Sequence, residues 1–239
     1  MDISIHNELN FKVQEKITNK NLKLEDICKN GLVGNITIGY LEGKVKVRKS
    51  SQSLLKEIAL QCEEIQKCYE LKDVLEIYNI KSCREAYRAF GHDPSKYRVA
   101  SESLFRRIVK GKGLYEINNI VEINNLISLK TALPVCAYDR EKINGNIIFK
   151  LGEENELYEG IGRGHINIYN LPCFYDQLGP FGTTTSDSVR AMITESTREL
   201  LLCIVSFHET NKMEEYLNYA KELLILEGNG LQITTKVVK

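Results

Sequence analysis

The sequence has no excess of charge of either sign. Its 239 residues include 32 Lys and Arg against 32 Asp and Glu, so the formal net charge is zero. A protein that holds polyanions through bulk charge is thereby excluded, and any nucleic-acid role needs a local basic patch. The hydrophobic share of 43% and the charged share of 27% are those of an ordinary folded chain.

Long apolar runs and clusters of metal ligands are also lacking. No run approaches the roughly 18 apolar residues that a membrane-spanning helix requires, so we expect no membrane partner. Polar and acidic residues at the start stand where a secretory signal would carry an apolar core, which predicts a cytoplasmic protein. The four histidines are scattered and the seven cysteines form no C-x-x-C pair, so we expect reduced thiols and no metal.

Proline and glycine are scarce outside one middle section. All four prolines and ten of the sixteen glycines lie between Gly91 and Gly182, and neither residue occurs in 44–90 or 183–227. No linker-like stretch separates two halves of the chain. We therefore expect a single domain over residues 1–239, with residues 1–80 integrated into it.

Local patterns predict an α+β fold. Apolar periodicity and capping residues predict helices over residues 51–69, 82–90, 101–110 and 213–227. Short β-type runs punctuated by glycine predict strands over residues 35–40, 44–48, 133–138, 146–151, 157–160, 166–169, 173–175 and 200–207. Residues 117–129 fit a helix by length and a strand by their Ile and Val content. Strands in the centre with helices mostly outside give the α+β class.

A local excess of basic residues lies at 81–112. This segment holds nine basic and three acidic residues, a net charge of +6, so the rest of the chain carries −6. Such a segment suits a surface that contacts phosphates, and a solvated helical face is the alternative. The candidate RNA-binding residues are Arg98, Arg106, Arg107, Lys110 and Lys112.

Two further features could form a small-molecule site. Residues 179–188 open with two glycines and continue with hydroxyl groups, so Thr184 and Asp187 could surround one ligand, or the segment could be an exposed turn. Cys136 ends an apolar run. A thiol nucleophile there needs a lowered pKa and a base such as His165, and a buried free cysteine is the alternative.

One longer stretch resembles a known family. Residues 113–125 read GLYEINNIVEINN, residues 133–139 read LPVCAYD, and residues 142–145 read KING. This resembles the segment G-I-R-x-I-N-N-V-V-D-V-T-N-Y…G-Q-P-x-H-A-F-D, followed by K-I-x-G, of the B3/B4 domain in the β chain of bacterial phenylalanine–tRNA ligase. Residues 190–196, RAMITES, are similar to the family's T-x-N-V-L-L-E-S.

The resemblance covers roughly residues 80–205 and points to the free-standing B3/B4 proteins. In these proteins a block like residues 84–107 of this chain, with its arginines, tyrosines and G-x-D-P, also looks typical. The chain is far too short for a full tRNA ligase. The resemblance implies a three-layer ββα sandwich that hydrolyses the ester of a wrong amino acid, chiefly tyrosine, from tRNA in trans. It implies aminoacylated tRNA as partner, the amino-acid moiety as ligand, no cofactor and no DNA.

The resemblance also implies a site. Cys136 aligns with the family histidine and Glu195 with the glutamate that binds the editing substrate, so both are candidate catalytic residues. We expect them to project into one cavity, with Asn118, Asn124, Thr184 and Asp187 as substrate-binding residues. Because the histidine is absent, two alternatives stay open: a noncatalytic RNA-binding module, and a small-molecule binder or thiol enzyme that reuses this pocket.

Overall fold

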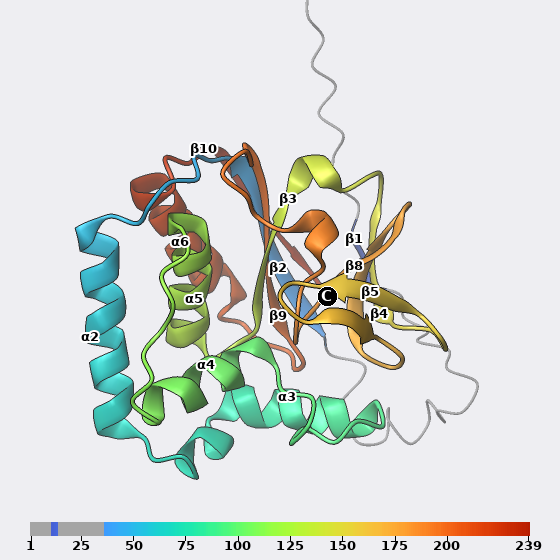
Figure 1. Cartoon of the computed structure of the whole chain (residues 1–239), viewed down its shortest axis with the longest axis horizontal. Helices are drawn as coiled ribbons and strands as arrows, with labels where there is room; N and C mark the ends of the chain where they lie inside the picture. The colour runs from blue at the N-terminus through green and yellow to red at the C-terminus, as the bar shows by residue number, and fades with distance from the viewer. Residues whose placement is uncertain (1–10, 14–35) are drawn as a thin grey trace, which may run out of the picture.

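The architecture is a helix layer and two sheets, as Figure 1 shows for a computed structural model that describes residues 11–13 and 36–239. One four-stranded sheet lies in the centre, with helices on one of its faces and a second four-stranded sheet on the other. The expected α+β class and three-layer ββα sandwich are confirmed. Residue 35, where the strand over residues 35–40 is expected to begin, lies outside the described residues. So do residues 1–10 and 14–34 of the 1–80 segment that we expect to be integrated into the domain.

The central sheet is buried on both faces. Its strand order is β10 (Leu231–Val238), β2 (Thr37–Lys44), β9 (Glu199–Ser206) and β3 (Val135–Asp139), all antiparallel. Alternate residues of β9 face opposite ways: Leu201 and Cys203 pack toward the outer sheet, while Leu200 and Leu202 pack toward the helices. An uninterrupted apolar run is what a strand covered on both faces requires.

The outer sheet carries the polar segment that the sequence singles out. Its order is β1 (Phe11–Val13), β4 (Ile147–Leu151), β7 (Pro172–Asp176) and β8 (Gly179–Thr183), with β1 parallel to β4. A separate hairpin pairs β5 (Leu157–Gly160) with β6 (Gly164–Asn167). Phe149, Phe174 and Phe181 of the outer sheet form an aromatic cluster that reaches Tyr138 of the central sheet. The two sheets therefore pack against each other through these aromatic side chains.

The helices occupy two places. The helix layer is built of α2 (Gln52–Cys68), α5 (Asn119–Thr131) and α6 (Met213–Glu227), and the end of the sandwich is crossed by η1 (Asp73–Glu76), α3 (Tyr78–Ala89) and α4 (Ala100–Val109). Two more short helical turns, η2 (Arg140–Lys142) and η3 (Val189–Ala191), follow β3 and β8. Ser51 caps α2 as expected, because its hydroxyl accepts from the Leu54 N–H at 3.1 Å.

The structure corrects or completes several local expectations. The strand expected at 35–40 continues to Lys44 as β2, and residues 45–48 of the second expected strand form no strand. Gly43 stays within it because Ile233 of β10 crosses so closely that a Cβ there would lie 2.5 Å from the Ile233 side chain. The helix expected from Ser82 begins earlier, at Tyr78, so Ser82 is buried in mid-helix and caps nothing. Of residues 117–129, for which helix and strand were both open, residues 119–129 lie in helix α5. The strands β8 and β10 were not predicted by the patterns.

Candidate RNA-binding surface and ester site

A buried carboxylate organises the corner between α3 and α4. Glu102 is 0% exposed, and both of its oxygens accept from Arg84 Nη1 at 3.0 Å. Arg98 and Arg106 of the same segment point at Oε1 from 3.8 and 3.7 Å. Arg106 lies one helical turn after Glu102 on α4 (Ala100–Val109), whereas Arg98 reaches the carboxylate from the segment just before the helix. Three guanidinium groups around one carboxylate leave the corner positively charged.

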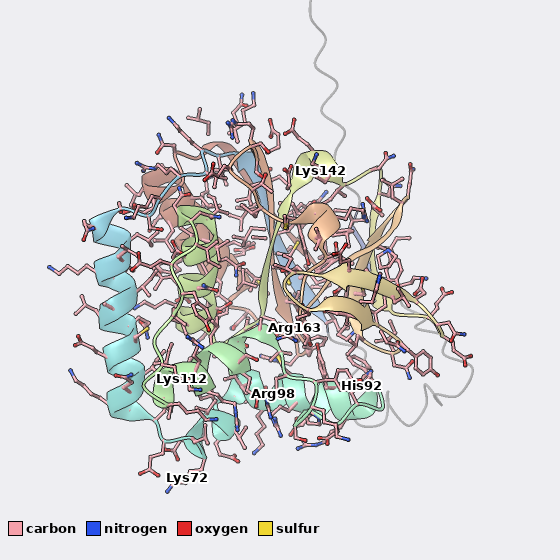
Figure 2. All side chains as sticks on the ribbon, in the orientation of Figure 1. Lys72, His92, Arg98, Lys112, Lys142 and Arg163 are labelled. Atoms are coloured by element: carbon pink, nitrogen blue, oxygen red, sulfur yellow. The ribbon has the colours of Figure 1, made fainter. Side chains whose placement is uncertain are left out.

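The five predicted RNA-binding residues line one concavity. It has a volume of about 220 Å³, and besides Ser103 its walls are Arg98, Arg106, Arg107, Lys110 and Lys112. We call it the basic concavity; Figure 2 labels two of its residues, Arg98 and Lys112, in the lower half of the view. The five residues that the sequence groups as candidates therefore lie together in the structure.

The residues of the basic concavity differ in how firmly they are held. Arg107 donates from Nε to the carbonyl of Gly113 at 2.7 Å, and its guanidinium lies 4.0 Å from the centre of the Tyr115 ring. Arg98 and Arg106 are held by Glu102. Lys110 and Lys112 are exposed. Fixed guanidinium groups beside two exposed ammonium groups suit a phosphate-bearing ligand.

The segment after β8 is a fixed loop and not an exposed turn. We call residues 183–188 the polar loop. Thr183 Oγ1 accepts from the N–H groups of Thr185 and Ser186, at 3.3 and 3.0 Å, which tightens the turn. The hydroxyl of Tyr87, from α3, shares hydrogen bonds with the hydroxyls of Thr184 and Thr185 at 2.7 and 2.8 Å. These bonds hold the loop against α3.

The polar loop and the basic concavity are joined by the start of α4. The N–H of Ala100, the first residue of α4, donates to the Thr184 carbonyl at 2.9 Å. Arg98 lies two residues earlier, in the wall of the basic concavity. The polar loop is therefore bonded to the segment that carries Arg98.

Asp187 is the group of the polar loop that can exchange a proton. The Tyr138 hydroxyl donates to its Oδ1 at 2.8 Å. Burial raises the pKa of Asp187 to about 7, although the hydrogen bond from Tyr138 lowers it. Gly182 makes this contact possible, because a Cβ there would lie 2.1 Å from the Tyr138 hydroxyl. A carboxyl group with a pKa near 7 suits general acid–base chemistry at neutral pH.

Cys136 lies close to the polar loop but is a buried thiol. It is 2% exposed, and its Sγ donates to the Thr183 carbonyl at 3.8 Å. Burial, with Asp187 nearby, raises the pKa of Cys136 well above its ordinary value. The base considered for it, His165, is exposed on β6. The geometry favours the buried free cysteine over a thiol nucleophile.

Glu195 is not brought into a cavity with Cys136. It is exposed on a turn that is closed by the Thr194 N–H donating to Thr197 Oγ1 at 3.0 Å. The Thr197 hydroxyl in turn donates to Asp139 at 2.8 Å, which fixes the turn at the far end of β3 with Glu195 outward. The expectation that Cys136 and Glu195 share one cavity is therefore corrected.

The two candidate asparagines lie on α5 and not on the polar loop. Asn118 is the N-cap of that helix, accepting from the Val121 N–H at 3.0 Å, which is a structural use of its side chain. Asn124 is half-buried, and its Oδ1 is buried without a hydrogen-bond partner among the described residues. Asn124 keeps a free acceptor, whereas Asn118 does not.

Sequence reasoning missed two residues of these sites. Glu102 was counted only as one of three acidic residues, although Arg98 and Arg106 at i−4 and i+4 were a signal for its role. Tyr138 has no such signal, because its partner Asp187 is 49 residues away. Among residues 11–13 and 36–239, no group of three or more His, Cys, Asp and Glu is placed to hold a metal ion.

No helix within the described ranges combines the length and the apolar character needed to cross a membrane.

Comparisons with known proteins assign the family. The model of the family described as B3/4 domain matches residues 82–223, more than half of the chain. Among solved structures, the chain is similar to an N-terminal fragment of the phenylalanyl-tRNA synthetase β-subunit from Pyrococcus horikoshii, with 12% identity and a TM-score of 0.43. That likeness covers 85% of this chain and 50% of the fragment, so the chain spans half the fragment's length. A comparison with curated proteins gave no match. This chain belongs to the B3/4 domain family.

Proposed function

We propose that this protein binds aminoacylated tRNA at the basic concavity and hydrolyses the ester of a mischarged amino acid at the polar loop. The substrate is phenylalanine tRNA that carries tyrosine or a similar amino acid. The observation that supports the proposal is the hydrogen bond from the Ala100 N–H to the Thr184 carbonyl, which connects the polar loop to the segment that carries Arg98. An RNA backbone in the concavity would present its acylated end to the loop.

The tRNA backbone is held by charge. Lys110 and Lys112 neutralise phosphates and release counterions, while Arg106, held by Glu102, offers a guanidinium that is already oriented. Because backbone contacts carry no sequence information, the concavity positions the tRNA and leaves selection to the amino-acid moiety.

Asp187 is the proposed general base. In its ionised form it takes a proton from a water molecule, whose oxygen attacks the ester carbonyl. The bond between the acyl carbon and the ribose oxygen breaks, and that oxygen takes the proton that Asp187 removed from the water, which restores the carboxylate. The products are the free amino acid and tRNA. The Tyr138 hydroxyl orients the carboxylate, and Cys136 contributes a neutral wall. No metal is needed, because the ester is already activated.

The RNA-binding part is tested with a double variant, Lys110→Ala with Lys112→Ala. Both side chains are exposed, so their removal leaves the bonds of Glu102 intact. Each lost phosphate contact should reduce the slope of log affinity against log salt by about 0.7–0.9, so tRNA binding weakens and its salt dependence flattens. The control removes two exposed lysines, Lys44 and Lys46, at the end of β2. An unchanged slope in the first variant would contradict the assignment.

A noncatalytic RNA-binding module is the second candidate. The exposed position of Glu195 and the presence of Cys136 in place of the family histidine favour it. The two candidates share the binding result and differ in hydrolysis. Retained tRNA binding with no release of any amino acid across a panel of mischarged tRNAs would select the module.

A further inference from the structure

The walls of the basic concavity are almost entirely cationic. Among the described residues, six line it: five Arg and Lys side chains and the exposed Ser103, so its lining holds no carboxylate, no aromatic ring and no apolar residue. The charged side chains offer only hydrogen-bond donors. A nucleobase would find no ring on which to stack and few acceptors to read. The lining therefore suits the phosphate group of a nucleic acid and not its bases.

The size of the basic concavity fits one phosphate group and not a whole nucleotide. Its volume of about 220 Å³ lies below the roughly 300–1,000 Å³ of sites that enclose most of a small molecule. The three arginines of the lining are half-buried, whereas Lys110 and Lys112 are exposed. The guanidinium groups therefore suit an enclosed phosphate, and the ammonium groups suit the part of the ligand that stays outside.

The positive charge around the basic concavity exceeds what one backbone phosphate neutralises. Three guanidinium groups share the single carboxylate of Glu102, which leaves two positive charges there. Arg107, Lys110 and Lys112 of the lining add three more. A phosphodiester inside an RNA strand carries one negative charge, whereas a terminal phosphate group carries about −1.5 to −2 and offers three acceptor oxygens. A terminal phosphate is the better match in charge and in number of acceptors.

The carbonyl groups at the end of α4, which would repel an anion, are occupied by donors. The Ile108 carbonyl accepts from Gln66 Nε2 at 2.9 Å and from the Gly111 N–H at 2.8 Å, and the Arg107 carbonyl accepts from the Lys112 N–H at 3.1 Å. Gly111 has a φ of +70°, so the chain turns there and brings Lys112 back toward Arg107. The turn after α4 thus gathers cations without presenting free carbonyls to a phosphate.

We infer that the basic concavity binds the terminal phosphate group at the 5′ end of an RNA, an inference that rests on the proposed binding of tRNA. The three arginines of the lining donate to the oxygens of this phosphate, and the two lysines contact the next phosphates of the strand. In a tRNA the 5′ terminus and the acylated 3′ end belong to the same end of one stem. A tRNA held by its 5′ phosphate therefore brings its acylated end to the protein as well.

Binding of one phenylalanine tRNA in two forms tests the inference. The forms carry a 5′-phosphate or a 5′-hydroxyl group, and filter binding is measured at about 0.15 M salt. A surface that holds only the backbone would barely distinguish them, because dephosphorylation leaves every internal phosphate in place. The 5′-hydroxyl form should bind at least about fivefold more weakly. A smaller difference overturns the terminal-phosphate site and leaves the proposed tRNA binding standing, whereas no binding of either form overturns both.

A free nucleotide carries the same terminal phosphate and is the other source to distinguish. Guanosine 5′-monophosphate should compete at least about tenfold more weakly than the 5′-phosphate tRNA, because it lacks the adjoining phosphates that Lys110 and Lys112 contact. Affinity equal to that of the tRNA would assign the concavity to free nucleotides and overturn the inference.

A variant tests whether the preference for the phosphate arises in the basic concavity. Arg98→Gln removes a side chain that is 41% exposed and 3.8 Å from Glu102, while Arg84 and Arg106 still hold that carboxylate. The ratio between the affinities of the two tRNA forms should fall at least about twofold. Lys96→Gln, at an exposed position outside the lining, is the control and should keep the ratio of the unmodified protein. An unchanged ratio in Arg98→Gln overturns the site.

Discussion

Two carboxyl groups, the buried Glu102 of α4 and the half-buried Asp187 of the polar loop, have opposite surroundings. Glu102 is contacted by Arg84, Arg98 and Arg106, whereas Asp187 accepts a hydrogen bond from Tyr138 and has no cationic partner among the described residues. Burial without a cation raises the pKa of Asp187 to about 7. Glu102 therefore has a structural role, because it holds the arginines of a charged surface. Asp187, whose pKa is raised, can gain or lose a proton near neutral pH.

The largest effect on the free energy of unfolding is expected from a change at Glu102. Glu102→Gln leaves three guanidinium groups without their anion, and breaking a buried ion pair in this way costs about 3–5 kcal/mol. Urea unfolding measures the loss. The control, Glu63→Gln, changes a side chain that is 61% exposed and should shift the free energy of unfolding by less than about 0.5 kcal/mol. Equal free energies of unfolding for Glu102→Gln and Glu63→Gln would contradict the structural role of Glu102 and so remove its contrast with Asp187.

Asp187 should make the free energy of unfolding depend on pH. The pKa of Asp187 is raised in the folded state, so its contribution is complete below the unfolded value near 4 and is lost as pH rises through about 7. The difference amounts to about 3 kcal/mol, allowing for the part of the residue that reaches solvent. Urea midpoints from pH 4 to 8 should fall less steeply in Asp187→Asn. Parallel curves would show that Asp187 titrates normally.

A smaller effect on the free energy of unfolding is expected when the hydroxyl group of Tyr138 is removed. Tyr138→Phe takes away the donor that favours the ionised carboxylate, so the pKa of Asp187 should rise further. The lost hydrogen bond should also cost about 1 kcal/mol of unfolding free energy. Carbon-13 NMR titration of the Asp187 carboxyl group reports the pKa directly. Tyr97→Phe, at a ring 37% exposed, serves as control. A pKa that stays in place would mean that Tyr138 does not set the charge of Asp187.

Elements with local signals were predictable from the sequence. The periodicity of α4 and α6 and the apolar run of β9 depend on neighbouring residues alone, and their predicted bounds agree with the structure within one residue. β8 and β10 were not predicted, because both exist through pairing with strands distant in sequence, β7 and β2. The break expected between residues 40 and 44 was wrong for the same reason, since only the crossing of Ile233 explains a glycine, Gly43, within a continuous strand.

The candidate sites divide in the same way. The basic concavity was predictable, because its residues lie within fifteen consecutive positions on and around one helix. The proposed ester site was predictable only as a polar loop with Asp187, because the donor Tyr138 and the close approach at Gly182 arise from the packing of two sheets. Glu195 was placed by alignment of a short segment, and the closure of its turn by Thr197 is invisible in sequence.

The most direct test is the initial rate at which the protein deacylates phenylalanine tRNA charged with tyrosine, compared with that of Asp187→Asn. The unmodified protein should release tyrosine at neutral pH. The variant should bind the tRNA with the same affinity and release tyrosine about a hundredfold more slowly or less, as expected for loss of a general base. A variant as fast as the unmodified protein would contradict the assignment of Asp187, and no release by either would contradict the hydrolase itself.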